Sequence, residues 1–200
     1  SPGSFALSTL PMWYKNQEAI LNEVIEAFSP TIQFTAVSVP NPHLIGIVND
    51  YYIKHQSHQF LLAQYLNNEN EYCADGVNVS YVYPMTDDSI YVRTYERGVG
   101  FTNACGTAMT ASALVANLNG IVKSNVVTVY NPGGFVKCVI NKEDSGYKLL
   151  LIGNATIKQL YSLKVIDDSF EWINCESTGE QVEYEECIKF VEQQINPYLK

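Results

Sequence analysis

The spacing of apolar residues along the chain predicts four helices. Between residues 16 and 28 the apolar side chains recur at helical intervals and would share one face, before Ser29-Pro30 ends the helix. That face would consist of Ile20, Leu21, Val24, Ile25 and Phe28. Helical spacing, or a run rich in Ala, Met and Leu, predicts the other helices over residues 55–67, 107–117 and 180–195.

Apolar and polar residues alternate in most of the remaining chain, and this alternation predicts strands. The predicted strands cover residues 33–39, 44–48, 76–83, 90–95, 125–130, 135–140, 147–152 and 155–166. Strands therefore dominate, and the regular strand–helix alternation of a doubly wound parallel sheet is missing. We expect an α+β fold in which a strongly curved sheet packs around the central helix over residues 107–117.

Composition narrows the class of protein. The chain has 200 residues, of which 46% are apolar and 16% charged, so it can form a packed core. At about 150 residues per domain, this length corresponds to one domain or one and a half. The excess of 21 acidic over 12 basic residues argues against a nucleic-acid partner. The longest apolar runs fall far short of the roughly 20 residues that span a bilayer, so we expect no membrane partner.

Cysteine usage and motif content argue against metals and cofactors. The five cysteines are scattered and form no Cys-x-x-Cys pair, so a zinc site is not expected. An odd number of cysteines fits a reducing compartment, which predicts a cytoplasmic location. The chain contains no HExxH, phosphate-binding loop or dinucleotide fingerprint, and no lysine in a context that indicates a pyridoxal Schiff base. We therefore expect neither a metal nor a cofactor.

Cys105 is the strongest candidate for chemistry. It lies between a glycine-rich loop and the predicted central helix, where free backbone N–H groups and the helix dipole would favour the thiolate. The amides of Gly106 and Thr107 could bind a carboxylate or a phosphate. A buried, unreactive thiol at a helix start is an equally good interpretation from chemistry alone. Cys73, Cys138, Cys175 and Cys187 lie in core-like or irregular stretches, and we expect no chemistry from them.

Three further residues carry weaker signals. Arg97 could clamp a carboxylate bidentately and Glu96 could hold an ammonium group, although a solvated ion pair is the usual role of such a dipeptide. His43 lies in a tight turn between two predicted strands. Because a Cys–His pair can form a nucleophile, a cysteine hydrolase has to be considered as well.

Taken in order, these segments resemble the diaminopimelate epimerase family. The resemblance covers about residues 1–166, and the stretch from Glu-Arg-Gly to Ala-Cys-Gly is its most specific part. The segments that carry it are Pro40-Asn41-Pro42-His43, Gly76-Val77-Asn78-Val79, Glu96-Arg97-Gly98-Val99-Gly100, Ala104-Cys105-Gly106-Thr107, Asn131-Pro132-Gly133-Gly134 and Gly153-Asn154-Ala155. The chain departs from the family pattern at Pro40, Phe101, Ala108 and Asn154, and none of these departures removes a charged group or a thiol.

The resemblance implies a fold of two mirrored domains, each formed by a curved sheet or barrel around a helix. Each domain of the family supplies one cysteine, and the Cys-Gly-Asn-Gly segment that carries the first cysteine is absent here. We therefore expect residues 1–34 to be a remnant of the first domain and residues 35–155 to form the whole second domain. Residues 156–200 would form a return strand and a C-terminal helical extension. The missing N-terminal half of the protein would be a partner, and a homodimer is compatible with the resemblance.

The family's reaction, interconversion of LL- and meso-diaminopimelate, uses two cysteines and no cofactor. Carried over residue by residue, Cys105 would be one acid/base, assisted by His43 and Glu96. The predicted contacts to the substrate come from Asn41, Asn78, Glu96, Arg97, Gly106 and Thr107. Three alternatives stay open: a related racemase acting on histidine or proline, a fragment that only binds a ligand, and the Cys–His hydrolase.

Overall fold

A computed structural model describes residues 4–144, 146–153 and 155–199. Over these residues the fold is α+β, with one large and mostly antiparallel sheet of nine strands and four α-helices. The strands of this sheet are β1 (Glu23–Val24), β2 (Gln33–Ser38), β3 (Pro42–Ile47), β4 (Asn78–Thr86), β5 (Ser89–Glu96), β6 (Gly100–Thr102), β7 (Val126–Asn131), β8 (Gly134–Glu143) and β9 (Gly146–Ile152). They follow the order β1-β2-β3-β4-β5-β7-β8-β9, with β6 paired to β5, and only the β3–β4 and β5–β7 pairs among them are parallel.

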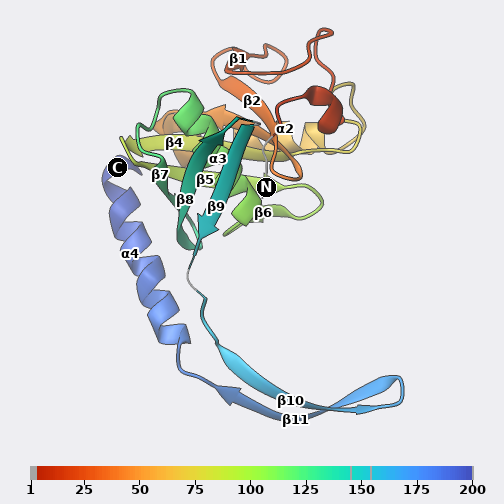
Figure 1. Cartoon of the computed structure of the whole chain (residues 1–200), viewed down its shortest axis with the longest axis vertical. Coiled ribbons are helices and arrows are strands. Elements are labelled where there is room, and N and C mark those ends of the chain that lie inside the picture. Colours follow the sequence, from red (N-terminus) through yellow and green to blue (C-terminus); the bar gives the residue numbers. More distant parts are fainter. Residues whose placement is uncertain (1–3, 145, 154, 200) are drawn as a thin grey trace.

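Helix α3 (Gly106–Leu118) lies at the centre of one face of this sheet (Figure 1). It contacts β2 and β3 as well as β8 and β9, so the sheet curves far enough for both of its ends to reach the same helix. Every residue from Ala108 to Ala116 is buried, because the small side chains of this helix let the surrounding strands approach closely. The helix ends at Leu118 and is followed by its C-cap residue Asn119 and by Gly120, whose φ of 69° favours glycine. This central helix and its bounds confirm the sequence prediction.

The opposite face of the sheet is covered by α1 (Asp50–Lys54), α2 (Ser57–Leu66) and the N-terminal segment with its short 3-10 helix (Leu7–Thr9). Arg93 of β5 ties these helices to the sheet. Its guanidinium donates to the carbonyls of Tyr52 and Ile53 and its Nε donates to Gln59 Oε1 at 2.8 Å. Helix α1 and strand β6 are absent from the sequence prediction, whereas α2 confirms the predicted helix over residues 55–67 within two residues.

The predicted helix over residues 16–28 is wrong. This segment is irregular apart from the two residues of β1, and Asn16 and Asn22 have positive φ angles of 57° and 55° that no α-helix accommodates. The backbone bonds to β2 instead, because the Ala36 N–H donates to the Ile20 carbonyl at 3.0 Å. Ile20 is buried, whereas Leu21, on the same predicted face, is 52% exposed. Contacts with the sheet have therefore overridden the helical spacing.

The C-terminal part leaves the main sheet. Strands β10 (Gln159–Ile166) and β11 (Ser169–Ser177) form a separate two-stranded hairpin, and α4 (Gln181–Leu199) runs back to contact α1, β7 and β8 (Figure 1). The strand predicted over residues 155–166 and the helix predicted over 180–195 are confirmed in kind, while β11 escaped prediction. Asn154 of the predicted Gly-Asn-Ala turn lies outside the described residues. Among those that are described, no helix has both the length and the hydropathy to cross a membrane.

Candidate functional site

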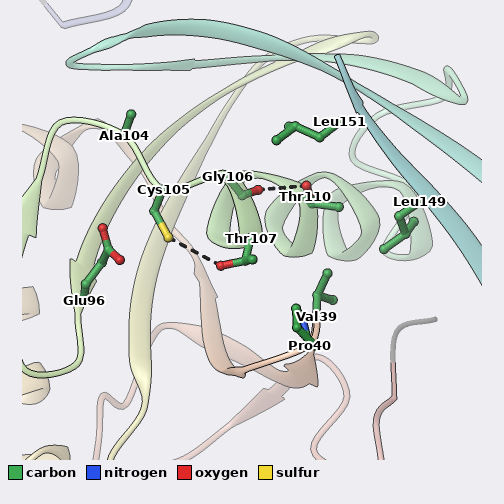
Figure 2. Close-up of a pocket in the computed structure, with 10 residues that line it drawn as sticks. All are labelled: Val39, Pro40, Glu96, Ala104, Cys105, Gly106, Thr107, Thr110, Leu149 and Leu151. Atoms are coloured by element: carbon green, nitrogen blue, oxygen red, sulfur yellow. Dashed lines mark hydrogen bonds between the residues drawn. The ribbon is translucent and has the colours of Figure 1, made fainter. Parts of the chain in front are cut away.

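Cys105 is the N-cap residue of α3. Its extended backbone (φ −141°, ψ 107°) turns the chain into the helix, and its carbonyl accepts the first helical hydrogen bond from the Met109 N–H at 2.9 Å. The thiol Sγ lies 3.5 Å from the Thr107 hydroxyl oxygen and points into an open cavity of about 520 Å³ (Figure 2). The cavity is lined by Val39, Pro40, Glu96, Ala104, Cys105, Gly106, Thr107, Thr110, Leu149 and Leu151.

Glu96 reaches the same cavity from the end of β5. The chain reverses after it into β6, and Gly98 and Gly100 occupy the tight turn with φ angles of 75° and 108°. The Thr102 hydroxyl donates to Glu96 Oε1 at 2.5 Å and thereby fixes the carboxylate. In Figure 2 the Glu96 carboxylate lies beside the Cys105 thiol, so the predicted pairing of these two residues in one site is present.

The net shift of the Cys105 pKa is opposite to the prediction. Burial raises the pKa of the Cys105 thiol, and the neighbouring Glu96 carboxylate raises it further. The Thr107 hydroxyl and the Ala108 backbone N–H stabilise the thiolate and lower the pKa, but the net direction is upward. The first turn of α3 thus favours the thiolate as expected, but burial and the Glu96 carboxylate outweigh it and the net shift of the Cys105 pKa is upward.

A glycine turn holds the loop that leads to Cys105. The Gly133 N–H donates to the Asn103 carbonyl at 2.8 Å and contacts Asn131 Oδ1 at 2.9 Å. A Cβ atom at position 133 would lie 2.8 Å from the Asn103 carbonyl oxygen, so only glycine allows this approach. From the far side, the Tyr184 hydroxyl of α4 donates to the Gly133 carbonyl at 3.2 Å. The turn from β7 to β8 therefore positions the site from about 30 residues away in the sequence.

The sequence did not predict the residues that form the apolar wall of the cavity. Val39 and Pro40 follow β2, and Leu149 and Leu151 point inward from β9, the edge strand at the opposite end of the sheet. A Cβ atom at Gly106 would lie 3.0 Å from Leu151 Cδ2, so this wall closes tightly on the start of α3. β9 carries an unbroken run of three leucines, so its pattern does not indicate which of them face the cavity, and only the tertiary fold brings Leu149 and Leu151 to Cys105.

His43 and Asn41 do not line the cavity. The His43 ring is fully buried, and its Nε2 lies 3.2 Å from Asn41 Oδ1. Burial lowers the pKa of His43 to about 4, with the nearby Arg97 charge acting in the same direction, so the ring is neutral at physiological pH. His43 is therefore placed to orient Asn41, and it does not face the cavity itself.

Asn78 and Arg97 also lie outside the cavity lining. Asn78 is the register partner of His43 on the adjacent parallel strand, and its Oδ1 accepts the Arg97 backbone N–H at 2.8 Å. The exposed Arg97 guanidinium donates to the Asp75 carbonyl at 2.8 Å. The structure thus brings Cys105, Glu96, Gly106 and Thr107 together at the cavity and places the other four predicted residues around it. Nowhere in residues 4–144, 146–153 and 155–199 do three or more His, Cys, Asp or Glu side chains gather as a metal site would require.

Comparison with known proteins identifies the family. The family model described as diaminopimelate epimerase matches residues 35–158, more than half of the chain. This chain belongs to the diaminopimelate epimerase family. All eight predicted site residues fall within the match, whereas the β10–β11 hairpin and α4 lie beyond it.

Relatives named diaminopimelate epimerase extend the match to the end of the chain. The relative from Listeria monocytogenes serotype 4b (strain F2365) is 46% identical over 195 residues, which are 96% of this chain and 59% of that protein. The relative from Listeria welshimeri is 45% identical, and the match covers 100% of this chain and 60% of that protein. The relative from Enterococcus faecalis is 43% identical, and the match covers 96% of this chain and 60% of that protein. The chain therefore spans about three fifths of the length of these epimerases.

Proposed function

We propose that this chain supplies one half of the active site of a cofactor-independent epimerase that interconverts LL- and meso-diaminopimelate. The observation that carries the proposal is Cys105 at the start of α3, facing a cavity beside Glu96, in a chain of the diaminopimelate epimerase family. Epimerisation requires one group to remove the α-proton and another to return a proton on the opposite face. A thiol whose pKa is raised by burial and by a neighbouring carboxylate is suited to the second task.

In the proposed reaction, a thiolate on the far side of the substrate takes the α-proton while Cys105 delivers its own proton to the carbon from the near side. The negative charge that develops on the α-carboxylate would be stabilised by the backbone N–H groups of Gly106 and Thr107. These groups belong to the first turn of α3, where the helix offers them no partner. As Cys105 loses its proton, the Thr107 hydroxyl and the Ala108 N–H would stabilise the thiolate that forms.

The remaining predicted residues would hold the other end of the substrate. Arg97 is exposed and its guanidinium uses a single donor on a backbone carbonyl, so the side chain can exchange this bond for a bidentate contact with a carboxylate. Asn41, oriented by the buried His43, and Asn78, which fixes the backbone of Arg97, would complete this part of the site. The apolar side chains of Leu149 and Leu151 would keep water from the reacting carbon.

The second acid/base has to come from elsewhere. Among the described residues Cys105 is the one cysteine that lines the cavity. Cys73 and Cys138 are buried in the two cores, Cys175 lies on the β10–β11 hairpin, and Cys187 of α4 lines a different pocket. We assign the second thiol to the two fifths of the relatives' length that this chain does not match. In this proposal residues 35–155 form one of two mirrored domains, a barrel around α3, while residues 1–34 belong to the other domain. The five free thiols support a cytoplasmic location.

The test is to incubate the protein with LL-diaminopimelate in D₂O and to follow both deuterium uptake and the meso product. The 200-residue chain alone should give no inversion at the rates of a normal enzyme, about 1–10³ s⁻¹. Co-expression with the unmatched segment of the Listeria monocytogenes relative should give the meso product. In that complex Cys105→Ala should abolish inversion, while the matched variant Cys138→Ala should retain it at some cost in stability.

Three outcomes would contradict the proposal. Inversion by the chain alone would show that the site is already complete. Retained inversion in the Cys105→Ala complex would rule out Cys105 as an acid/base. Faster turnover of histidine or proline than of diaminopimelate would favour the related racemase over the epimerase.

A further inference from the structure

Strand β6 presents side chains to both faces of the main sheet. It pairs antiparallel with the end of β5, with Tyr95 opposite Phe101 and Thr94 opposite Thr102. Because side chains alternate across a strand, Thr102 shares the face of Glu96, which α3 covers, and Phe101 lies on the opposite face. There Phe101 packs against the core cluster beneath α1 and α2. This short strand therefore connects the helices of one face with the site on the other.

The Phe101 ring is part of an aromatic cluster. Its centroid lies 5.3 Å from that of Tyr95 in an edge-to-face contact and 6.5 Å from that of Phe60 of α2 in a stacked contact. The Arg93 guanidinium lies over the ring, with Cζ 5.7 Å from the centroid. These partners are themselves fixed, since Gln64 Nε2 donates to the Tyr95 hydroxyl at 2.5 Å and the Arg93 guanidinium donates to two carbonyls of α1. Such ring and cation contacts hold Phe101 in one position.

The backbone on the N-terminal side of β6 does little to hold this strand in place. The strand has three residues and follows the turn at Gly98 and Gly100, where an added Cβ atom would meet no described atom within 4 Å. Glycine leaves the backbone more freedom than any other residue. On the C-terminal side, the Asn103 carbonyl is held by the Gly133 N–H. Packing of the Phe101 ring therefore supplies the anchor that the glycine turn lacks.

We infer that Phe101 is a positioning residue for the site at Cys105, because it anchors β6 to α2 so that the Thr102 hydroxyl holds the Glu96 carboxylate beside the thiol. The last link is the hydrogen bond of 2.5 Å from Thr102 Oγ1 to Glu96 Oε1, and Figure 2 shows this carboxylate beside Cys105. Phe101 itself does not line the cavity. The inference rests on the proposed function for its consequence for turnover, whereas its effect on Cys105 can be measured in this chain alone.

The pKa of the Cys105 thiol reports where the Glu96 carboxylate lies. Of the described groups that shift this pKa, Glu96 is the charged one, and it raises the pKa. If Phe101→Ala frees β6, the carboxylate loses its donor and turns toward solvent, so the pKa of Cys105 should fall. Alkylation of Cys105, followed by peptide mass spectrometry, gives a pH profile whose midpoint reports the pKa and whose plateau reports accessibility. Well below the midpoint, the rate relative to the plateau should be at least about threefold higher than in the parent chain.

Two further variants show by which route Phe101 acts. Thr102→Val removes the hydroxyl but keeps the branched shape of the side chain, and it should lower the midpoint as Phe101→Ala does. Glu96→Gln has no carboxylate to position. Adding Phe101→Ala to Glu96→Gln should therefore leave the midpoint where Glu96→Gln alone places it.

Tyr91→Ala is the matched control. Tyr91 lies on the same face of β5 as Tyr95 and in the same core cluster, but its register partners are on β4 and β7 and not on β6. Tyr91→Ala should therefore destabilise the chain to urea and leave the Cys105 midpoint at the parent value. If either alanine variant fails to fold, Phe101→Leu and Tyr91→Leu repeat the comparison with less loss of packing.

The outcomes separate this inference from the proposed function. If Phe101→Ala keeps the parent midpoint, or if Tyr91→Ala lowers the midpoint as much, Phe101 has only a structural role and the inference is overturned. If the shift caused by Phe101→Ala persists in the Glu96→Gln background, Phe101 reaches Cys105 by another route, which also overturns it.

Turnover is measured in the complex with the unmatched segment of the Listeria monocytogenes relative. Phe101→Ala should slow inversion by about tenfold, because small displacements of a group at the reacting centre cost rate steeply. Unchanged inversion in an active complex would refute a role of Phe101 in the reaction. If the midpoints shift as expected while the parent complex gives no meso product, the positioning of Glu96 by Phe101 stands and the proposed function fails.

Discussion

Replacing Gly133 with Ala tests whether the turn between β7 and β8 holds the Cys105 loop in place. The added Cβ atom would lie 2.8 Å from the Asn103 carbonyl oxygen and 3.0 Å from its carbonyl carbon. Ordinary contact begins at 3.4 Å, so one of the two backbone segments must move by about 0.6 Å. Cys105 follows two residues after Asn103, and the same shift would stretch the 2.8 Å hydrogen bond from the Gly133 N–H.

Two measurements follow from this displacement. Forcing an extra methyl group into close packing typically costs about 1–3 kcal/mol, which urea unfolding of the chain would detect. A displacement of about 1 Å can cost roughly 100-fold in rate, so a shift of about 0.6 Å should slow inversion by the assembled complex about tenfold. Gly153→Ala is the matched control, because its Cβ atom would meet nothing closer than Val136 Cγ1 at 3.5 Å. If Gly133→Ala unfolds and turns over like this control, the turn does not position the loop.

Two other predictions concern protonation. Glu96→Gln should lower the pKa of Cys105 by removing a neighbouring negative charge, and Thr107→Val should raise it by removing a hydroxyl that stabilises the thiolate. The pH dependence of Cys105 alkylation, followed by peptide mass spectrometry, measures both shifts. If both substitutions shift the pKa in the same direction, this reasoning is refuted. The pKa of His43 is about 4 in the folded chain, below its ordinary 6.5, so the unfolded chain binds the extra proton and stability falls as the pH drops from 6.5 to 4. This loss, about 3 kcal/mol, should be absent from the pH dependence of unfolding in His43→Asn.

The local pattern of apolar and polar residues was sufficient to predict much of the fold. Strands β4 and β5 could be predicted because their residues alternate on either side of a Thr-Asp-Asp turn. The central helix could be predicted because it runs from a glycine loop to Asn119-Gly120 without a residue that breaks it. In these segments the period of the sequence and the tertiary environment favour the same structure.

Residues 16–28 were mispredicted because their sequence period and their tertiary environment favour different structures. Their apolar spacing fits a helix, yet the Asn22 N–H donates to the Thr35 hydroxyl at 2.9 Å and the Ile20 carbonyl accepts from β2. Hydrogen bonds to a neighbouring strand replaced those that a helix would have made within the segment. Helical propensity is a weak influence of less than about 1 kcal/mol per residue, so such contacts override it readily.

In the candidate site, too, some features follow from the local sequence and others depend on the tertiary fold. Cys105, Gly106, Thr107 and Glu96 could be predicted as one site because they lie within twelve residues of each other and the loop between them is short. The walls formed by β2 and β9 could not, because their closeness to Cys105 depends on the curvature of the whole sheet around α3. The direction in which the pKa of Cys105 shifts also depends on the tertiary fold. The helix start alone favours the thiolate, but burial beneath the surrounding strands and the fixed Glu96 carboxylate outweigh it, and both are consequences of the tertiary fold. A local motif can thus point to a candidate residue, whereas the direction in which the pKa of its thiol moves depends on residues that the fold brings to it.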